Sequence, residues 1–525
     1  MSVKPIWLDC DPGHDDAIAL LLACHHPRIK LLGVSTVAGN APGALTFINA
    51  ARLLVAFGNV KGDQKECTNG GDVPLLRGAD EPLVSEKRKD AAIHGEDGLG
   101  GVLGLPDFDS SAVRRRMWSS HGGAPSSASS SPPLPFPSPA LVANTLSSLL
   151  TQRRALCLPP LTICVTGPCT NIALFLKLYS HLATREYIEQ VVVMGGSAGA
   201  SGNRGQLAEF NFLVDPEAAR IVCDAPLKVV MAGLNVTHQA IFTPEIHDRL
   251  LQRTKPSASQ PSPTFSRSSS QPSNSTMSKT ALLPPASPSA GSSRLNTNQL
   301  LHPGTPASGL SNIRKLVSSA MTFFASTYAH EFGFVHGPPI HDMLVVAYVI
   351  EPRLFYTCSP PTTGMGPIGM SMHRSLNRAN VNDSLKRRKK KDTRAHPNEG
   401  TALAVNTVSS ATEADANANA DKPETNGNSL ANGHVRAYAD PARVLPPKRY
   451  AVRIDTADTS LAVGASVVDF YNQWGLPSEA PGDADGNGSS WGRGGRNVEV
   501  LEEVDTSGLW NLLLEVVDRA EAALA

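Results

Sequence analysis

Asp9-Cys10-Asp11-Pro12-Gly13-His14-Asp15-Asp16-Ala17 is the most informative segment of this chain. It places four carboxylates within eight residues. Residues 6–8 before it form an apolar run typical of a strand, residues 17–23 after it form a run typical of a helix, and Pro12-Gly13 makes the turn. The acidic residues therefore lie between the carboxyl end of a strand and the start of a helix. Open α/β sheets bind their ligands at this place.

A divalent metal site is the interpretation that this acidic segment favours. Carboxylates this close repel one another unless a cation shares them, and oxygen ligands suit a hard cation. Asp15 and Asp16 could instead only cap the helix and interact with its dipole. That alternative does not account for Asp11, which lies on the strand side of the turn.

Composition limits the classes of function. The chain has 525 residues with 47 basic and 47 acidic side chains, so no net charge favours nucleic acid or a membrane surface. No run approaches the roughly 18 apolar residues that span a bilayer, and we expect no signal peptide before the first strand. The eight cysteines show no metal-ligand spacing, and several lie in apolar segments. They predict buried thiols in a reducing compartment, by default the cytoplasm.

Four segments are too polar to build a core: residues 119–139, 255–312, 360–447 and 478–496. They are rich in Ser, Pro, Asn or Gly, so we expect disordered insertions. Without them roughly 340 residues remain, which suits one domain running from residue 1 to 525 with four interruptions. The basic run Lys386–Lys391 is either a nuclear-import signal or a solvated tail, and we favour the tail because such short runs match by chance.

The rest of the chain alternates between strand and helix patterns. Strands are predicted at residues 6–10, 31–37, 162–165, 190–194, 228–232, 353–357 and 449–454. Helices are predicted at residues 16–24, 44–57, 170–178, 216–223, 244–251, 313–332, 342–350 and 509–524. This alternation predicts an α/β fold with an open, mainly parallel sheet and helices on both faces.

Polar residues recur where the predicted strands end. Asn40 follows the second strand, Thr166 begins a Thr-Gly-Pro turn, and Met194 precedes two glycines. Each of them alone is a weak signal, because a Thr-Gly-Pro turn is structural more often than not and a Met at a strand end usually belongs to the core. Together they would line one crevice at the carboxyl edge of the sheet.

Three further positions carry groups suited to chemistry. Glu209 and Asn211 offer a carboxylate and an amide that suit the vicinal hydroxyls of a sugar, although a surface loop is an equal alternative. His341 stands next to Asp342 at a helix start, where it could serve as a general acid beside a metal ligand. Asp342 could instead be only a helix cap, and His341 only a satisfied loop histidine, which is the commoner role of a lone His. His94 lies in a Gly-rich loop that is either a lid or a simple turn.

Seven motifs make the chain resemble one family. DCDPGHDDA, VAGN at 37–40, IHGEDGLGG at 93–101, TGPCTN at 166–171, MGG at 194–196, AEFN followed by DPEAA, and IHD at 340–342 are similar to those of the inosine/uridine-preferring nucleoside hydrolases. They occur in the family's order, and at its spacing once the four polar segments are removed. The resemblance implies an open α/β sheet with a calcium ion (Ca²⁺) at its carboxyl edge.

The resemblance also implies a role for each matched residue. The calcium ligands would be the side chains of Asp11, Asp16 and Asp342 and the backbone carbonyl of Thr166. Asp11 would be the general base that activates water, and His341 the general acid for the departing base. The ribose hydroxyls and the base would be held by Asp15, Asn40, His94, Met194, Asn203, Glu209, Phe210 and Asn211.

The implied activity is calcium-dependent hydrolysis of the N-glycosidic bond of ribonucleosides, uridine, inosine or both, to ribose and free base. The transition state would be oxocarbenium-like, as in other glycoside hydrolysis. The implied partner is a small-molecule ribonucleoside, with no nucleic acid or membrane, and we expect a homo-oligomer. Met343 and Cys169 depart from the family, where Pro and Leu are frequent. The segment 255–312 precedes the helix over the base pocket, so the preferred base stays open.

Two alternatives belong to other classes. Asp9-x-Asp11 could mark a metal-dependent phosphohydrolase with an aspartyl nucleophile, but no phosphate-binding Lys or Ser/Thr motif follows. A catalytically inactive nucleoside-binding protein is also conceivable. It is disfavoured because every matched catalytic position is intact.

Overall fold

A computed structural model describes residues 2–58, 72–121, 134–252, 310–358, 444–445, 447–457, 460–476 and 495–525. The chain divides into two compact units, Met1–Thr357 with Leu445–Ala525, and Cys358–Val444. Nearly all of the second unit lies outside the described residues.

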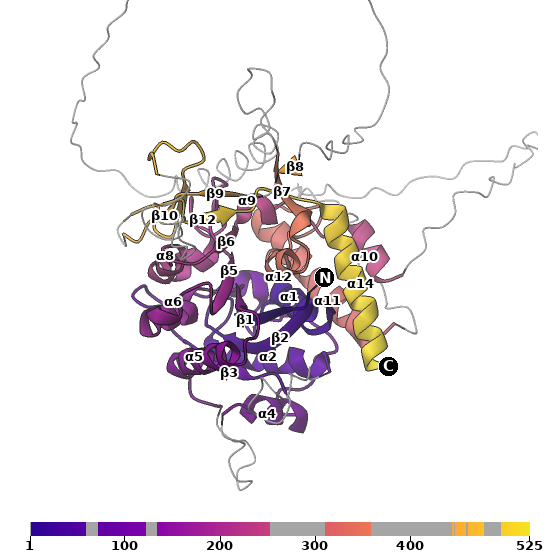
Figure 1. Cartoon of the computed structure of the whole chain (residues 1–525). Coiled ribbons are helices and arrows are strands. Elements are labelled where there is room, and N and C mark those ends of the chain that lie inside the picture. Colours follow the sequence, from indigo (N-terminus) through magenta and orange to yellow (C-terminus); the bar gives the residue numbers. More distant parts are fainter. Residues whose placement is uncertain are drawn as a thin grey trace, which may run out of the picture. The chain divides into compact units, whose positions relative to one another are not determined.

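An eight-stranded sheet forms the centre of the first unit (Figure 1). Its strand order is β3-β2-β1-β4-β5-β6-β12-β9, and every neighbouring pair is parallel except β12 and β9. The strands are β1 (Lys4–Cys10), β2 (Ile29–Thr36), β3 (Leu75–Arg77), β4 (Leu161–Val165), β5 (Ile188–Met194), β6 (Val229–Ala232), β9 (Lys448–Tyr450) and β12 (Val498–Val500). The predicted mainly parallel sheet is confirmed.

Helices cover both faces of this sheet, and the alternation of side chains along β1 shows how. Ile6 and Leu8 belong to one core and Trp7 to the other, as the two-residue period of a strand requires. The first core is built with α1 (His14–His25), α2 (Gly43–Ala56), α4 (Ser111–Trp118), α11 (Asn312–Phe332), α12 (Met343–Ile350) and α14 (Thr506–Leu524). The second is built with α5 (Pro139–Ala155), α6 (Thr170–Leu178) and α8 (Pro216–Cys223).

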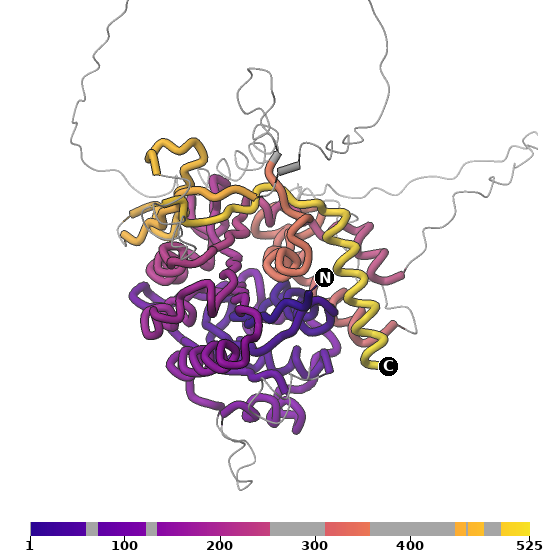
Figure 2. The backbone as a smooth tube through the Cα atoms, viewed as in Figure 1, coloured from indigo at the N-terminus to yellow at the C-terminus, as the bar shows by residue number. Residues whose placement is uncertain are grey.

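The two ends of the chain meet in the first core. Figure 2 shows α14, in yellow, beside the indigo segment that contains β1 and α1, and these helices are in contact. The apolar side of α14 is buried through Leu509, Trp510, Leu513, Val516 and Val517. The last helix therefore supports the first one, which carries the acidic segment.

Short elements complete the unit. The helices are α3 (Ala91–His94), α7 (Phe210–Val214), α9 (Leu234–Thr237) and α10 (Pro244–Leu250). Strand β7 (Phe355–Cys358) pairs with β13 (Glu503–Val504), and β10 (Val452–Ile454) pairs with β11 (Ser466–Val468). The two residues Val444–Leu445 form strand β8.

One predicted strand is wrong in the structure. Residues 449–454 form two strands, β9 and β10, which belong to different sheets. The break has a local cause, because the side-chain amide of Asn497 accepts from the N–H of Val452 at 2.8 Å and donates to its carbonyl at 3.1 Å. That side chain occupies the hydrogen-bonding groups that a continuing strand would use in the main sheet.

The four proposed insertions lie mostly outside the described residues, as does Lys386–Lys391. Three of their predicted edges are too wide. Residues 444–445 of the segment 360–447 form β8. Pro139 already begins α5, where the Ser138 side chain accepts from the N–H of Leu141, and Asn312 already begins α11 behind the cap residue Ser311. None of the described helices is both long enough and apolar enough to cross a membrane.

Candidate active site

The acidic segment folds into a compact carboxylate cluster. Asp15 and Asp16 occupy the first turn of α1, and Asp342 precedes α12, so two helix N-termini meet there. Oxygen atoms of these three side chains lie within 4.8 Å of one another, and all three residues are buried. Burial, together with the charge of Asp16, raises the pKa of Asp15 to about 7. Burial, with the charges of Asp15 and Asp16 next in effect, raises the pKa of Asp342 well above its ordinary value. Repulsion of this kind is relieved by a shared cation.

Helix capping alone does not account for the contacts of Asp16. One oxygen of Asp16 does accept from the N–H of Gly13 at 2.9 Å, as a cap would. The same oxygen also accepts from Nδ2 of Asn40 at 3.1 Å, and the other accepts from the Thr166 hydroxyl at 2.7 Å. Asp16 therefore joins three strand-end segments that are far apart in sequence.

Asp11 lies against the backbone of two neighbouring strand ends. A Cβ at Gly39 would lie 2.0 Å from its Oδ2, and one at Gly167 would lie 2.7 Å from its Oδ1, so both positions need glycine. Oδ2 accepts from the N–H of Asn40 at 2.8 Å, whereas no described residue donates to the buried Oδ1. Burial, with Asp16 next in effect, raises the pKa of Asp11 well above its ordinary value.

This donor set fits a hard cation. Its ligands are carboxylate oxygens, which Ca²⁺ and Mg²⁺ prefer, and Asp11 offers one buried oxygen that no described residue satisfies. The expected ligands Asp11, Asp16, Thr166 and Asp342 are at the same edge of the sheet. The closest trio, however, contains Asp15 in place of Asp11.

Glu209 has a structural role that the sequence did not reveal. It is the N-cap of α7, and its carboxylate accepts from the N–H groups of Asn211 at 2.8 Å, Phe212 at 3.1 Å and Gly196 at 3.0 Å. Burial raises its pKa to about 7 despite these hydrogen bonds. The carboxylate thus ties the loop after β5 to the start of α7.

Asn211 is held in one orientation. Its Nδ2 donates to the Thr166 carbonyl at 2.8 Å and lies 3.2 Å from the Met194 carbonyl and 3.4 Å from the Met194 sulfur. The amide nitrogen is therefore occupied by protein atoms. The amide oxygen is left for a ligand.

A pocket brings most of the predicted residues together. Those that line it are Asp15, Asn40, His94, Thr166, Met194, Asn203, Glu209, Phe210, Asn211, His341 and Asp342. Asp11 and Asp16 are buried and are not among its lining residues. Oδ1 of Asn203 is buried, and none of the described side chains or backbone groups donates to it.

Part of the pocket's lining is aromatic, and the sequence motifs did not predict it. Phe324, Tyr328 and Phe332 of α11 line the pocket. Their spacing of four residues places them on one helix face, and this was a readable signal. Asp90 and Ile93 also line the pocket without having been predicted.

His341 uses both ring nitrogens within the protein. Nε2 lies 2.8 Å from the Tyr328 hydroxyl and Nδ1 lies 2.8 Å from the Thr237 hydroxyl. Burial lowers the pKa of His341 well below its ordinary value, so the ring is neutral at pH 7. A neutral imidazole keeps one donor and one acceptor, and the two hydroxyls can serve both.

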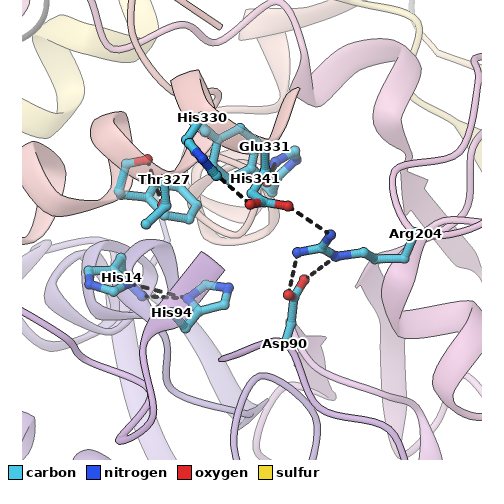
Figure 3. Close-up of polar contacts among 10 residues, drawn as sticks. His14, Asp90, His94, Arg204, Thr327, His330, Glu331 and His341 are labelled. Atoms are coloured by element: carbon cyan, nitrogen blue, oxygen red, sulfur yellow. Dashed lines mark hydrogen bonds and ion pairs between the residues drawn. The ribbon is translucent and has the colours of Figure 1, made fainter. Parts of the chain in front are cut away.

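His94 is supported by a second buried histidine, His14 (Figure 3). Nε2 of His14 donates to the Gly100 carbonyl at 2.9 Å, and its ring stacks on Phe323 with centroids 5.0 Å apart. The two Nδ1 atoms lie 3.3 Å apart. Burial lowers the pKa of His14 to about 4. His94 is therefore held at the pocket by a neutral, stacked partner.

A family model described as inosine-uridine preferring nucleoside hydrolase matches residues 6–511. The pyrimidine-specific ribonucleoside hydrolase RihA of Shewanella baltica is 40% identical over 247 residues, 47% of this chain and 64% of that protein. The RihA of Shewanella oneidensis is 33% identical over 352 residues, 67% of this chain and 79% of that protein. The first match thus spans just under two thirds of its relative.

A solved structure supports the fold. The plant nucleoside hydrolase PpNRh1 has a TM-score of 0.54 and 17% identity to this chain, with 98% of each chain covered. At this identity the likeness concerns the fold alone. It agrees with the parallel sheet and its helices described above.

Proposed function

Because the chain belongs to the inosine-uridine preferring nucleoside hydrolase family, we propose that it hydrolyses the N-glycosidic bond of ribonucleosides to free base and ribose. One observation carries the proposal. A single pocket joins the buried carboxylates and amides of the sheet edge to the aromatic face of α11. The polar side suits a sugar, and the aromatic side suits a planar base.

We propose pyrimidine ribonucleosides, uridine first, as the preferred substrates and inosine as the second choice. Support comes from the two bacterial relatives, which are named as pyrimidine-specific. The base would lie near His94, Phe210 and the side chains of α11.

We propose Ca²⁺ as the metal of the carboxylate cluster, held by Asp11, Asp16, Asp342 and the Thr166 carbonyl. Asp15 is close enough to compete as a ligand. We keep Asp11 in the set because its buried Oδ1 is without a donor among the described residues. When bound, such a cation lowers the pKa of water and orients it.

The chain's own residues then have separate tasks. Asp11 takes the proton of the attacking water. Asn40, Asn203, Asn211 and Asp15 hold the ribose, and hydrogen bonds that strengthen as the ring flattens lower the barrier. His341 assists the leaving base as an acid. Burial lowers the pKa of His341 and so opposes its protonation. We propose that its help matters most for purines, because they offer a ring nitrogen to protonate.

The test is ribose release. Purified full-length protein is incubated with uridine, cytidine, inosine, adenosine and guanosine, with and without inorganic phosphate, and free ribose is measured. We expect release without phosphate, fastest from uridine, abolished by a chelator and restored by Ca²⁺. A requirement for phosphate with formation of ribose 1-phosphate would identify a phosphorylase. Phosphate release from a phosphomonoester would favour the phosphohydrolase alternative.

We also propose a homo-oligomer in the cytoplasm. The buried cysteines of the described part of the chain, such as Cys10 and Cys164, are free thiols, as a reducing compartment favours. Light scattering during gel filtration would measure the oligomeric state. Imaging of a tagged protein would measure the location, and nuclear accumulation would reassign the basic run Lys386–Lys391.

A further inference from the structure

Arg204, which belongs to none of the sequence motifs, lies beside the pocket and binds Asp90 (Figure 3). Its Nε donates to Oδ2 of Asp90 at 2.6 Å, and its Nη2 donates to Oδ1 of the same carboxylate. A guanidinium that binds both oxygens of one carboxylate is a strong and well-oriented pair. The side chains are only 23% and 10% exposed, so solvent screens the pair weakly.

Asp90 is connected to residues of the pocket through its backbone. Its carbonyl accepts from the N–H groups of Ile93 and His94, each at 3.1 Å, and so begins the short helix α3. Its own N–H donates to the Asn40 carbonyl at 3.3 Å. A fixed Asp90 therefore fixes His94 and Asn40.

Arg204 is the neighbour of Asn203 in the loop after β5. Asn203 lines the pocket, and its buried Oδ1 lacks a donor within the described parts of the chain. An unpaired buried acceptor is unfavourable until a ligand supplies a hydrogen bond. Because Asn203 directly precedes Arg204, the position of Arg204 influences where Oδ1 of Asn203 lies in the pocket.

The third contact of Arg204 is with the end of α11. Its guanidinium lies 5.1 Å from the ring centroid of Phe332, which also lines the pocket. Nη1 lies 4.0 Å from Oε2 of Glu331. Figure 3 shows Arg204 between Asp90 and Glu331, so one side chain connects the residue before α3 to the end of α11.

We propose that Arg204 is a positioning residue: by clamping Asp90 and the end of α11, it closes the pocket and holds Asn203 and His94 against the substrate. The role in hydrolysis rests on the proposed function, whereas the clamp itself does not. An ordinary ion pair at a surface would contribute little to stability and nothing to the site. Here the pair is mostly buried, and its partners line the pocket.

The test compares variants of the full-length protein. Arg204→Met keeps the aliphatic stem and removes the charge, and Arg204→Lys keeps the charge without the two-pronged geometry. Asp90→Asn weakens the pair from the other side. The matched control is Arg154→Met, which removes an ion pair with Glu186 at 3.0 Å whose side chains are 52% and 60% exposed.

The first measurement is hydrogen exchange of the backbone amides of residues 90–101 and 197–208 without substrate. We expect exchange at least about tenfold faster in Arg204→Met, a smaller effect in Arg204→Lys, and no change in the control. Unchanged exchange in Arg204→Met overturns the clamp, whatever the activity. This outcome is independent of the failure of the proposed function, which wild-type protein would show by releasing no ribose.

The second measurement is kcat and KM for uridine. We expect kcat/KM to fall about 10- to 100-fold in Arg204→Met, with part of the loss in kcat, because small misplacements of binding groups slow the reaction. The thermal midpoint should fall little, and the double variant Asp90→Asn/Arg204→Met should lose no more than Arg204→Met. Faster exchange with unchanged kcat/KM, or additive losses, would overturn the positioning role.

Discussion

At the scale of single residues, Asp11 carries the most specific prediction. We expect Asp11→Ala to reduce kcat by at least about a hundredfold, since a general base typically contributes 10²–10⁴-fold. The same change should weaken Ca²⁺ binding, because one carboxylate of the cluster is lost. Steady-state kinetics and calorimetric titration of metal measure the two effects.

The control for Asp11 is Asp107→Ala, an exposed loop residue that should leave both quantities unchanged. Near-normal kcat in Asp11→Ala would show that another group activates the water. Normal metal binding with lost turnover would assign Asp11 to proton transfer alone.

Glu209 gives a prediction for the pH dependence of stability. Burial raises its pKa from 4.5 to about 7 in the folded protein. A carboxyl group with a raised pKa binds its proton more tightly when folded. Its contribution to the free energy of unfolding is therefore complete below about pH 4.5 and is lost as the pH rises through 7. We expect the difference between wild type and Glu209→Gln to fall over this range.

Urea unfolding of both metal-free proteins at several pH values measures that difference. The other buried acids titrate in both proteins, so their effects cancel. Parallel stability curves for wild type and Glu209→Gln would show that Glu209 keeps its ordinary pKa.

Sequence reasoning found residues with local signals and missed those whose partners depend on the fold. Asp11, Asn40 and Thr166 follow strand ends, so their meeting at one edge was predictable. Arg204 and Asp90 are 114 residues apart. Their pairing depends on how two loops fold, which neither local sequence contains.

At the scale of elements, the apolar side of α14 supports α1. Leu513 is 1% exposed in the first core, so we expect Leu513→Ala to lower the free energy of unfolding by about 2–5 kcal/mol. Leu524 in the same helix is 43% exposed, and Leu524→Ala should change it by less than about 0.5 kcal/mol. Urea denaturation measures both, and equal effects would contradict this packing.

Element prediction succeeded where apolar runs were long. Strand β1 and helix α12 are almost entirely buried, and their sequences showed it. Strands β3 and β12 have three residues each, too few for a periodic pattern. Helix α5 was not predicted because it directly follows a Ser/Pro-rich stretch. Its buried Val142, Leu146 and Leu149 nevertheless have helical spacing, and Ser138 and Pro139 are a readable helix start.

At the scale of the whole molecule, residues 360–443 should be dispensable. Their composition is polar and cannot offset ordering entropy, and each doubling of a loop's length costs only about 0.6 kcal/mol. Strands β7 and β9 on either side already pair with β13 and β12. Joining the two ends with a short Gly/Ser linker should leave the thermal midpoint and kcat/KM nearly unchanged. This deletion keeps β8, which lies within the predicted insertion 360–447.

Calorimetry and uridine kinetics measure these two quantities for the shortened and full-length proteins. An insoluble shortened protein would show that the segment is structural. Lost turnover in a normally folded one would give it a part in the reaction.

The fixed amide of Asn211 has a consequence for the choice of substrate. Its nitrogen is engaged by the Thr166 and Met194 carbonyls, so its oxygen is the side-chain group that remains to accept a hydrogen bond from a ligand in the pocket. Asn203 likewise has a buried oxygen that receives no hydrogen bond from the described residues. A substrate must therefore bring hydroxyl donors, and one that lacks a hydroxyl leaves a buried acceptor empty, a defect by which enzymes reject analogues about 10⁴-fold or more. If the proposed function holds, we expect ribonucleosides to be hydrolysed and 2′-deoxyribonucleosides, which lack one hydroxyl, to be poor substrates.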